Sequence, residues 1–121
     1  MDIAGAHLTP IGDGDFLLEP TRGLDITNSD TLIEGILHRI QMTKGQRLYY
    51  DLSELVIIDP VYYQWMSRLA RACQAVNVKM VCVHMQPTAA FALSQFLQEI
   101  PPFTCALDVE RNKRLNETPN L

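Results

Sequence analysis

The stretch RLYYDLSELVIIDP, residues 47–60, contains a strand, a loop and the first residues of a helix. Its first six residues are aromatic or apolar at most positions, which is typical of a strand covered on both faces. Asp59 and Pro60 predict a helix start, because aspartate accepts backbone N–H bonds at an N-cap and proline fits the first helical turn. A strand that leads into a helix in this way is the repeating unit of α/β proteins.

The rest of the chain repeats this alternation of strands and helices. Glycine and aspartate at residues 12–15 predict a hairpin turn near the N-terminus, because both tolerate positive φ. Apolar side chains recur at helical spacing in three later segments, and Pro101 and Pro102 end the last of these. We expect strands at residues 7–11, 16–19, 47–52, 78–83 and 103–107, and helices at residues 28–45, 59–76, 87–100 and 108–115.

These elements predict a single α/β domain over residues 1–121, with residues 1–6 and 116–121 frayed. The order ββαβαβαβα implies a mostly parallel sheet, because each crossover helix returns the chain to the same end of the sheet. The leading hairpin adds one antiparallel edge strand, and the helices pack against the sheet.

Composition excludes several classes of function. The net charge is -4 and the ten lysines and arginines are scattered, so nucleic acid is not an expected partner. No apolar run approaches the roughly 18–20 residues that span a bilayer, and the N-terminus lacks a basic signal region. We therefore expect a cytoplasmic protein that does not bind membranes. Cys73, Cys82 and Cys105 have long spacings, which predicts buried structural thiols in a reducing compartment, with no metal or other cofactor.

Few residues offer catalytic chemistry. Asp51 and Asp59 follow strand ends and could line one crevice, but we favour a structural explanation, a strand-end hydrogen bond for Asp51 and an N-cap for Asp59. His84 leaves a strand in the same manner, but a general base needs a nucleophile and an orienting acid. The sequence has no GxSxG elbow and no glycine-rich phosphate loop. We expect no enzyme, and a small α/β enzyme using His84 and Asp59 is the least favoured alternative.

Two neighbouring tyrosines are expected to differ in environment. Tyr62 shares the apolar stripe of its helix with Trp65 and Met66, which predicts a place in the core. Tyr63 lies off that stripe, which predicts an exposed aromatic anchor for a partner protein.

Three segments carry a resemblance to a known family. Residues 50–59, YDLSELVIID, resemble the signature of the STAS (anti-anti-sigma-factor) family, in which a strand ending in Asp-Leu-Ser/Thr leads to an aspartate that opens a helix. Residues 75–90, AVNVKMVCVHMQPTAA, and residues 105–110, CALDVE, are similar to segments of the stressosome scaffold proteins RsbS and RsbR. The resemblance covers residues 10–115, and it implies the STAS fold and a protein-interaction domain.

Members of this family act in bacterial partner-switching pathways, as anti-sigma-factor antagonists or as stressosome scaffolds. The resemblance implies a serine-kinase-type switch protein (RsbT-like) or STAS paralogues as partners, and a homo-oligomer. In the family, phosphorylation of a serine or threonine in the first turn of the second helix dissolves the complex. Pro60 stands at that position here and has no hydroxyl, and His84 replaces a family glycine. Ser53, Ser67 and Thr88 are the substitute candidates for phosphorylation.

We therefore expect partners to dock around the start of the second helix and the loop that follows the fourth strand. The residues predicted to form this site are Asp59, Pro60, Tyr63, Met85, Gln86 and Thr88. One further alternative stays open: a STAS module that senses a small molecule in the crevice near Asp59 and Thr88.

Overall fold

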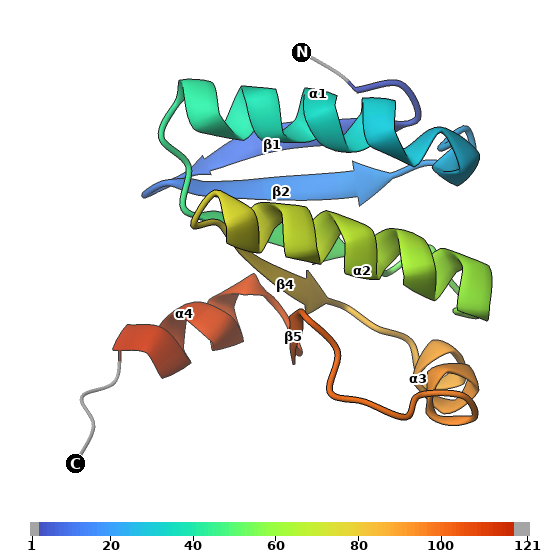
Figure 1. Cartoon of the computed structure of the whole chain (residues 1–121). Helices are drawn as coiled ribbons and strands as arrows, with labels where there is room; N and C mark the ends of the chain where they lie inside the picture. The colour runs from blue at the N-terminus through green and yellow to red at the C-terminus, as the bar shows by residue number, and fades with distance from the viewer. Residues whose placement is uncertain (1–2, 118–121) are drawn as a thin grey trace.

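A computed structural model describes residues 3–117 of the chain, with side chains as far as Lys113. Five strands form one sheet in the order β1-β2-β3-β4-β5 (Figure 1). β1 and β2 pair antiparallel, and the other three pairings are parallel. This arrangement confirms the predicted sheet, including its antiparallel edge strand. The strands are β1 Ala6–Gly12, β2 Asp15–Pro20, β3 Arg47–Asp51, β4 Lys79–Val83 and β5 Thr104–Ala106.

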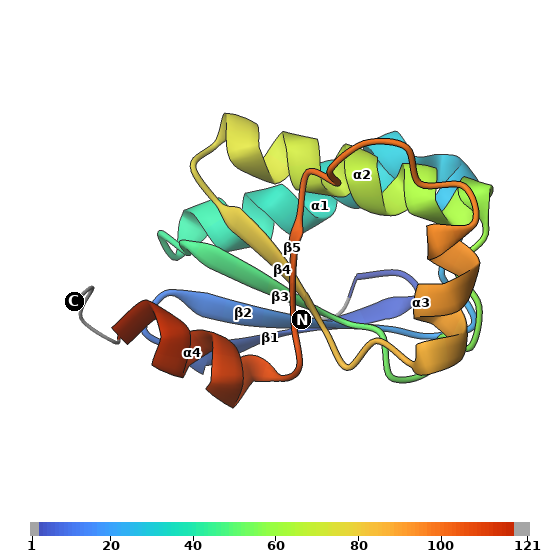
Figure 2. The same cartoon turned by 90° about the horizontal axis from the view of Figure 1, so that it is seen from below.

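The helices are unequally divided between the two faces of the sheet. Figure 2 shows α1 and α2 on one face and α4 on the other, while α3 lies beyond the carboxyl ends of the parallel strands. A short 3-10 turn, η1, leads into α1. The helices are α1 Ser29–Met42, α2 Pro60–Ala75, α3 Pro87–Ser94 and α4 Val109–Glu117, and η1 is Ile26–Asn28.

The sheet separates two apolar cores of different size. The larger core lies under α1 and α2 and includes Leu18, Ile36 and Leu69, all fully buried. The smaller core lies under α4 and centres on Tyr49, Val81 and Val83. Alternating side chains of β3 and β4 enter one core or the other, so both strands are covered on both faces, which was predicted for β3.

Polar contacts attach α4 to its face of the sheet. The side-chain amide of Asn112 donates a hydrogen bond of 2.9 Å to the Tyr49 hydroxyl, and both groups are buried. Lys113 Nζ lies 3.8 Å from the buried carboxylate of Asp15, which also accepts a 2.9 Å bond from Arg47 Nε. α4 begins where predicted, because Asp108 Oδ1 accepts the backbone N–H of Arg111 at 2.7 Å.

Several predicted element ends are wrong. The third helix stops at Ser94, and Ile100 is 94% exposed, although the apolar pattern predicted a helix as far as that residue. The pattern misleads because Phe96 and Leu97 still pack against the larger core after the helix has ended. The N-cap residue of α1, Asn28, makes no side-chain cap hydrogen bond. Instead Asp25 caps η1, accepting the backbone N–H of Thr27 at 3.1 Å.

The connection from α1 to β3 contains Lys44 and Gly45, which have different structural roles. Lys44, and not Gly45, has the positive φ, at 55°. Gly45 is needed for space, because a Cβ there would lie 2.6 Å from a methyl carbon of Ile40 and 2.9 Å from the Phe16 ring. The hairpin turn is confirmed, with positive φ at Gly12, Asp13 and Gly14.

Order near the N-terminus and the exposure of one cysteine also differ from the predictions. Residues 3–6 are not frayed: Ile3 bridges to Ala6, and the Gly5 carbonyl accepts the Thr21 N–H at 2.8 Å. α4 continues through Glu117, while residues 1–2 and 118–121 lie outside the described part of the chain. Cys73 and Cys82 are buried as predicted, but Cys105 on the edge strand β5 is exposed.

Candidate functional site

The start of α2 lies beyond the carboxyl end of β3 and has the predicted geometry. Asp59 Oδ1 accepts the backbone N–H of Tyr62 at 2.7 Å, which satisfies one of the free donors of the first turn. Pro60 is the first helical residue. Its missing N–H removes no helical hydrogen bond, and its fixed φ suits the first turn. Asp59 and Pro60 together therefore define where the helix begins.

Side-chain hydrogen bonds connect the β3–α2 loop to the β4–α3 loop and to the first turn of α3. Gln86 Nε2 donates to the Ser53 carbonyl at 2.7 Å, and the Thr88 hydroxyl donates to the Val56 carbonyl at 2.6 Å. Neither loop lies in a helix or strand, so these bonds satisfy carbonyls that secondary structure leaves free. Two segments about thirty residues apart in sequence are thus joined into one surface.

His84 adds a third connection at the same end of the sheet. Its Nδ1 lies 3.0 Å from Asp51 Oδ1, which also accepts the Ser53 N–H at 2.9 Å. The backbone of His84 has φ 60°, a left-handed conformation that favours glycine. The glycine found here in the family is therefore consistent with this backbone.

The alternative of a His84–Asp59 enzyme gains no support from the geometry. The acid beside His84 is Asp51, and among the described residues no serine or cysteine is hydrogen-bonded to His84.

No group of three or more His, Cys, Asp or Glu side chains in the described part of the chain could hold a metal ion. No helix of residues 3–117 is long and apolar enough to cross a membrane.

Four large apolar side chains around the two loops are exposed to solvent. We call them the apolar patch: Val56, Ile57, Val61 and Phe91. Their exposed fractions range from 55% for Val56 to 69% for Phe91. They come from the β3–α2 loop, the first turn of α2 and the middle of α3. These exposed side chains were not predicted, although Val56 and Ile57 stand in a predicted loop, where apolar residues are uncommon.

The prediction that Tyr63 lies outside the core is wrong. Its ring is half-buried and makes edge-to-face contacts with Phe96 and Phe103, at centroid distances of 5.7 and 6.1 Å. Tyr63 also lines a cavity of about 280 Å³ that Pro60 and Arg71 share with residues 96–99. A helix position away from the main stripe is covered here by the segment that follows α3.

Tyr62 is half-buried and belongs to a chain of hydrogen bonds that enters the core. Its hydroxyl lies 2.5 Å from the Tyr50 hydroxyl, which accepts a 2.9 Å bond from Trp65 Nε1. Burial raises the pKa of both tyrosines, and it raises that of Tyr50 well above the usual value. Both phenols therefore stay protonated at neutral pH and can donate.

A second cavity, of about 530 Å³, opens beside Tyr62. Its wall combines the apolar side chains of Leu24 and Leu55 with the charged groups of Glu54 and Arg22. It lies where β2 ends, next to the β3–α2 loop, and neither Asp59 nor Thr88, the residues of the crevice considered as the alternative site, lines it.

The three hydroxyls proposed as substitute phosphorylation sites differ in access. Ser67 is 2% exposed on the buried side of α2, so the folded protein does not present it to a kinase. Ser53 and Thr88 are exposed, but the Thr88 hydroxyl is engaged with Val56.

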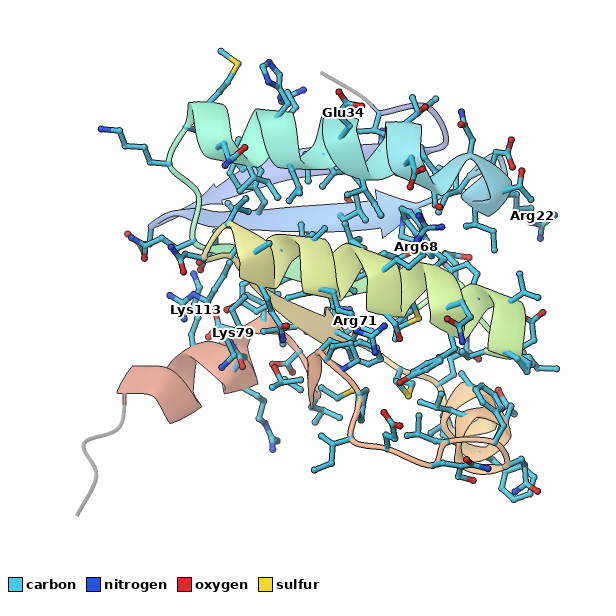
Figure 3. The ribbon with its side chains drawn as sticks, viewed as in Figure 1. Arg22, Glu34, Arg68, Arg71, Lys79 and Lys113 are labelled. Atoms are coloured by element: carbon cyan, nitrogen blue, oxygen red, sulfur yellow. The ribbon has the colours of Figure 1, made fainter. Side chains whose placement is uncertain are left out.

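Four of the basic side chains labelled in Figure 3 are not among the predicted docking residues. In Figure 3, Arg68 of α2 points toward α1, where it pairs with Asp30. Arg71 follows one turn later on the other side of the helix, at the cavity that it shares with Tyr63. Lys79 and Lys113 lie at the opposite end of the molecule from α3.

No protein-family profile and no curated protein matches the chain. Solved structures do match it. RsbS of Moorella thermoacetica, as a variant with serine replaced by glutamate, is 19% identical with a TM-score of 0.71, over 93% of this chain and 98% of that one. A protein from the stressosome, a signal integration and transduction hub, is 18% identical with a TM-score of 0.69, over 92% of this chain and 99% of that one.

A third similar structure is a candidate anti-sigma factor antagonist from Thermotoga maritima. It is 13% identical with a TM-score of 0.64, over 88% of this chain and 90% of that one. At these identities the likeness establishes the fold. The chain therefore has the STAS fold that the sequence resemblance implied.

Proposed function

We propose that this chain is a cytoplasmic protein-interaction domain of a bacterial partner-switching pathway, acting as an anti-sigma-factor antagonist or a stressosome-type scaffold. Its partners are a serine-kinase-type switch protein or other STAS domains, including further copies of itself, and it catalyses no reaction. The STAS fold and the likeness to RsbS and to a stressosome protein support this proposal.

The observation that carries the proposal is the apolar patch. Large exposed apolar residues that gather on neighbouring elements are typical of protein-binding surfaces. The patch side chains come from the elements that carry or adjoin the predicted docking residues, which have distinct roles. Asp59 and Pro60 fix the start of α2, and Gln86 and Thr88 hold the two loops together.

Tyr63 and Met85 complete the proposed site from beneath. Both side chains are half-buried and pack against the larger core. In this arrangement they support the surface, while the contact energy comes from the patch side chains, which have the most area left to bury.

The same site is proposed to bind without a phosphorylation switch. Pro60 has no hydroxyl at the position where the family carries its phosphorylated residue. A kinase partner can therefore be held without a modification that adds repulsive charge at this point of the contact.

The test is a binding measurement with the serine-kinase-type switch protein and the STAS paralogues of the same bacterium. Ile57→Asp places a charge in the patch and should weaken binding by about tenfold or more, because an unpaired charge is costly in an interface. Met42→Asp is the control, since Met42 is also largely exposed, at 70% against 61% for Ile57, but lies at the end of α1, away from the patch. Equal binding by the two variants, or no binding to any of these partners, contradicts the proposal.

The cavity beside Tyr62 supports a second candidate function, the sensing of a small molecule. Its volume of about 530 Å³ lies within the usual range for ligand sites, and its wall mixes apolar and charged groups. Native mass spectrometry of protein purified from its own bacterium distinguishes the two functions. A stoichiometric small-molecule adduct that Leu55→Arg removes favours sensing, and a ligand-free oligomer favours scaffolding.

A further inference from the structure

Strands β4 and β5 place two cysteines directly opposite each other. Cys82 and Cys105 are paired residues in the parallel register, between the pairs Val81–Thr104 and Val83–Ala106. Residues paired in this way point to the same face of a sheet, and neighbouring strands are about 4.8 Å apart. A disulfide requires Cα atoms roughly 4.4–6.8 Å apart, so this pairing permits one.

The two thiols differ in access and in acidity. Cys105 is exposed on the edge strand, whereas Cys82 is fully buried in the larger core. A hydrogen bond from the Cys82 thiol lowers the pKa of Cys105, and burial raises the pKa of Cys82 well above its usual value. The accessible sulfur is therefore also the one with more thiolate, which is the form that reacts with oxidants.

We propose that Cys105 and Cys82 form a peroxide-sensitive pair, in which Cys105 is oxidised first and Cys82 closes an intramolecular disulfide. This inference is independent of the proposed docking function. Reactive thiols beside a second, resolving cysteine are the usual arrangement of redox-sensing sites. Such disulfides also occur in reducing compartments, where they are transient.

The chemistry uses one molecule of hydrogen peroxide. The Cys105 thiolate attacks a peroxide oxygen, the O–O bond breaks, and hydroxide leaves Cys105 as a sulfenic acid. The Cys82 sulfur then attacks the Cys105 sulfur, the S–O bond breaks, and the oxygen leaves as water with the proton from Cys82. Two thiols lose two electrons in total, and one peroxide is reduced to two waters.

The cross-link would fix the shortest strand of the sheet. β5 has three residues and, within the described chain, pairs only with β4. The residue after it, Leu107, accepts the His84 N–H through its carbonyl at 3.1 Å. Oxidation would therefore tether β5 to β4 next to the point where the β4–α3 loop begins.

The chain contains a built-in control. Cys73 lies in α2, is fully buried, and has a pKa that burial raises to about 12. It should not react while the protein is folded, because its thiol is buried. The expected outcome is that peroxide reduces the number of free thiols from three to one.

The experiment treats the reduced, full-length protein with hydrogen peroxide and maps the products by mass spectrometry. Trypsin alone leaves both cysteines on one peptide, residues 80–111, because no lysine or arginine lies between them. Cleavage after Glu99 separates them, so the two fragments stay joined only through a disulfide. We expect the two fragments to remain joined, with a mass two hydrogen atoms lower than the sum of the reduced fragments. The intact protein should keep the mass of a monomer, because the disulfide is intramolecular.

Variants test the order of events. Cys105→Ser should remove the reaction with peroxide, Cys82→Ala should leave Cys105 as a sulfenic acid that dimedone captures, and Cys73→Ser should react like the wild type. Thermal melts check each fold, and Cys82→Val replaces Cys82→Ala if the latter is unfolded. The proposal is overturned if the folded wild type retains three free thiols after peroxide treatment, or if Cys73 reacts as fast as Cys105. It is also overturned if Cys105 links two chains, or if Cys105 overoxidises while Cys82 stays free.

Discussion

Tyr50→Phe should destabilise the protein more than Tyr62→Phe, although each change removes one hydroxyl from the same hydrogen-bond chain. The Tyr50 hydroxyl stands in the middle of this chain, between Trp65 Nε1 at 2.9 Å and the Tyr62 hydroxyl at 2.5 Å. The Tyr62 hydroxyl stands at its end, and the Tyr62 side chain lines a cavity.

The magnitudes follow from what each variant leaves unpaired. Without the Tyr50 hydroxyl, the buried indole N–H of Trp65 has no acceptor, which costs about 1–3 kcal/mol, and the bond to Tyr62 is lost for about 1 kcal/mol more. Without the Tyr62 hydroxyl, Tyr50 still accepts from Trp65, and its own O–H can turn to water in the cavity that Tyr62 lines, so the cost is about 1 kcal/mol. We therefore expect the free energy of unfolding to fall by about 2–4 kcal/mol in Tyr50→Phe and by about 1 kcal/mol in Tyr62→Phe.

The assay is urea and thermal unfolding, followed by the fluorescence of Trp65, the single tryptophan of the chain. At roughly 4 °C per kcal/mol for a domain of this size, the two melting temperatures should be separated by several degrees. Tyr63→Phe is the control, because the Tyr63 hydroxyl has no hydrogen-bond partner among the described residues, and its variant should melt like the wild type. The double variant should cost less than the sum of the single changes.

Two results contradict this prediction: an equal loss of stability in Tyr62→Phe and Tyr50→Phe, or a loss in the double variant that equals the sum of the two single losses. Either result means that the hydroxyls do not act as one connected chain.

Three further predictions concern the site. His84→Gly should be about 1 kcal/mol more stable than His84→Ala in chemical denaturation, because both lose the Asp51 contact but only glycine fits φ 60° without strain; equal stability contradicts this. Pro60→Ser should change the free energy of unfolding by less than about 1 kcal/mol, because Asp59 still caps α2. The new serine should also be phosphorylated by the switch kinase, as detected by peptide mapping, and a serine that stays unmodified counts against the proposed docking geometry. Tyr63→Ala should lower stability by about 2 kcal/mol in thermal melts, because it empties a half-buried aromatic contact; an unchanged melting temperature contradicts the packing.

The strand and helix order could be predicted because its signals are local. Asp59 and Pro60 mark a helix start through their own backbone chemistry, and the glycines and aspartates of residues 12–15 turn the chain without help from distant residues. The residues of the proposed docking site were predicted to lie close together for a similar reason, since the carboxyl ends of parallel strands meet at one end of the sheet.

The features that were missed depend on packing between distant segments. Tyr63 looked exposed because helical periodicity describes a helix against one surface, whereas Phe96 and Phe103 cover a second side of α2. Cys105 looked buried because an apolar strand gives no sign of being at a sheet edge. Ile100 continued an apolar stripe that the fold does not use.

The loops around the apolar patch are already held in one arrangement before any partner arrives. Gln86 and Thr88 donate to carbonyls of the neighbouring loop, and Asp59 and Pro60 fix the helix that follows it. A surface ordered in advance loses little conformational entropy on binding, so more of its contact energy remains as affinity. Serine at residue 60 would keep the helix start but add a point where phosphate could oppose binding, whereas proline keeps the helix start alone. In the proposed role, this combination favours a lasting scaffold contact, whose regulation has to come from the partner or from another site on this chain.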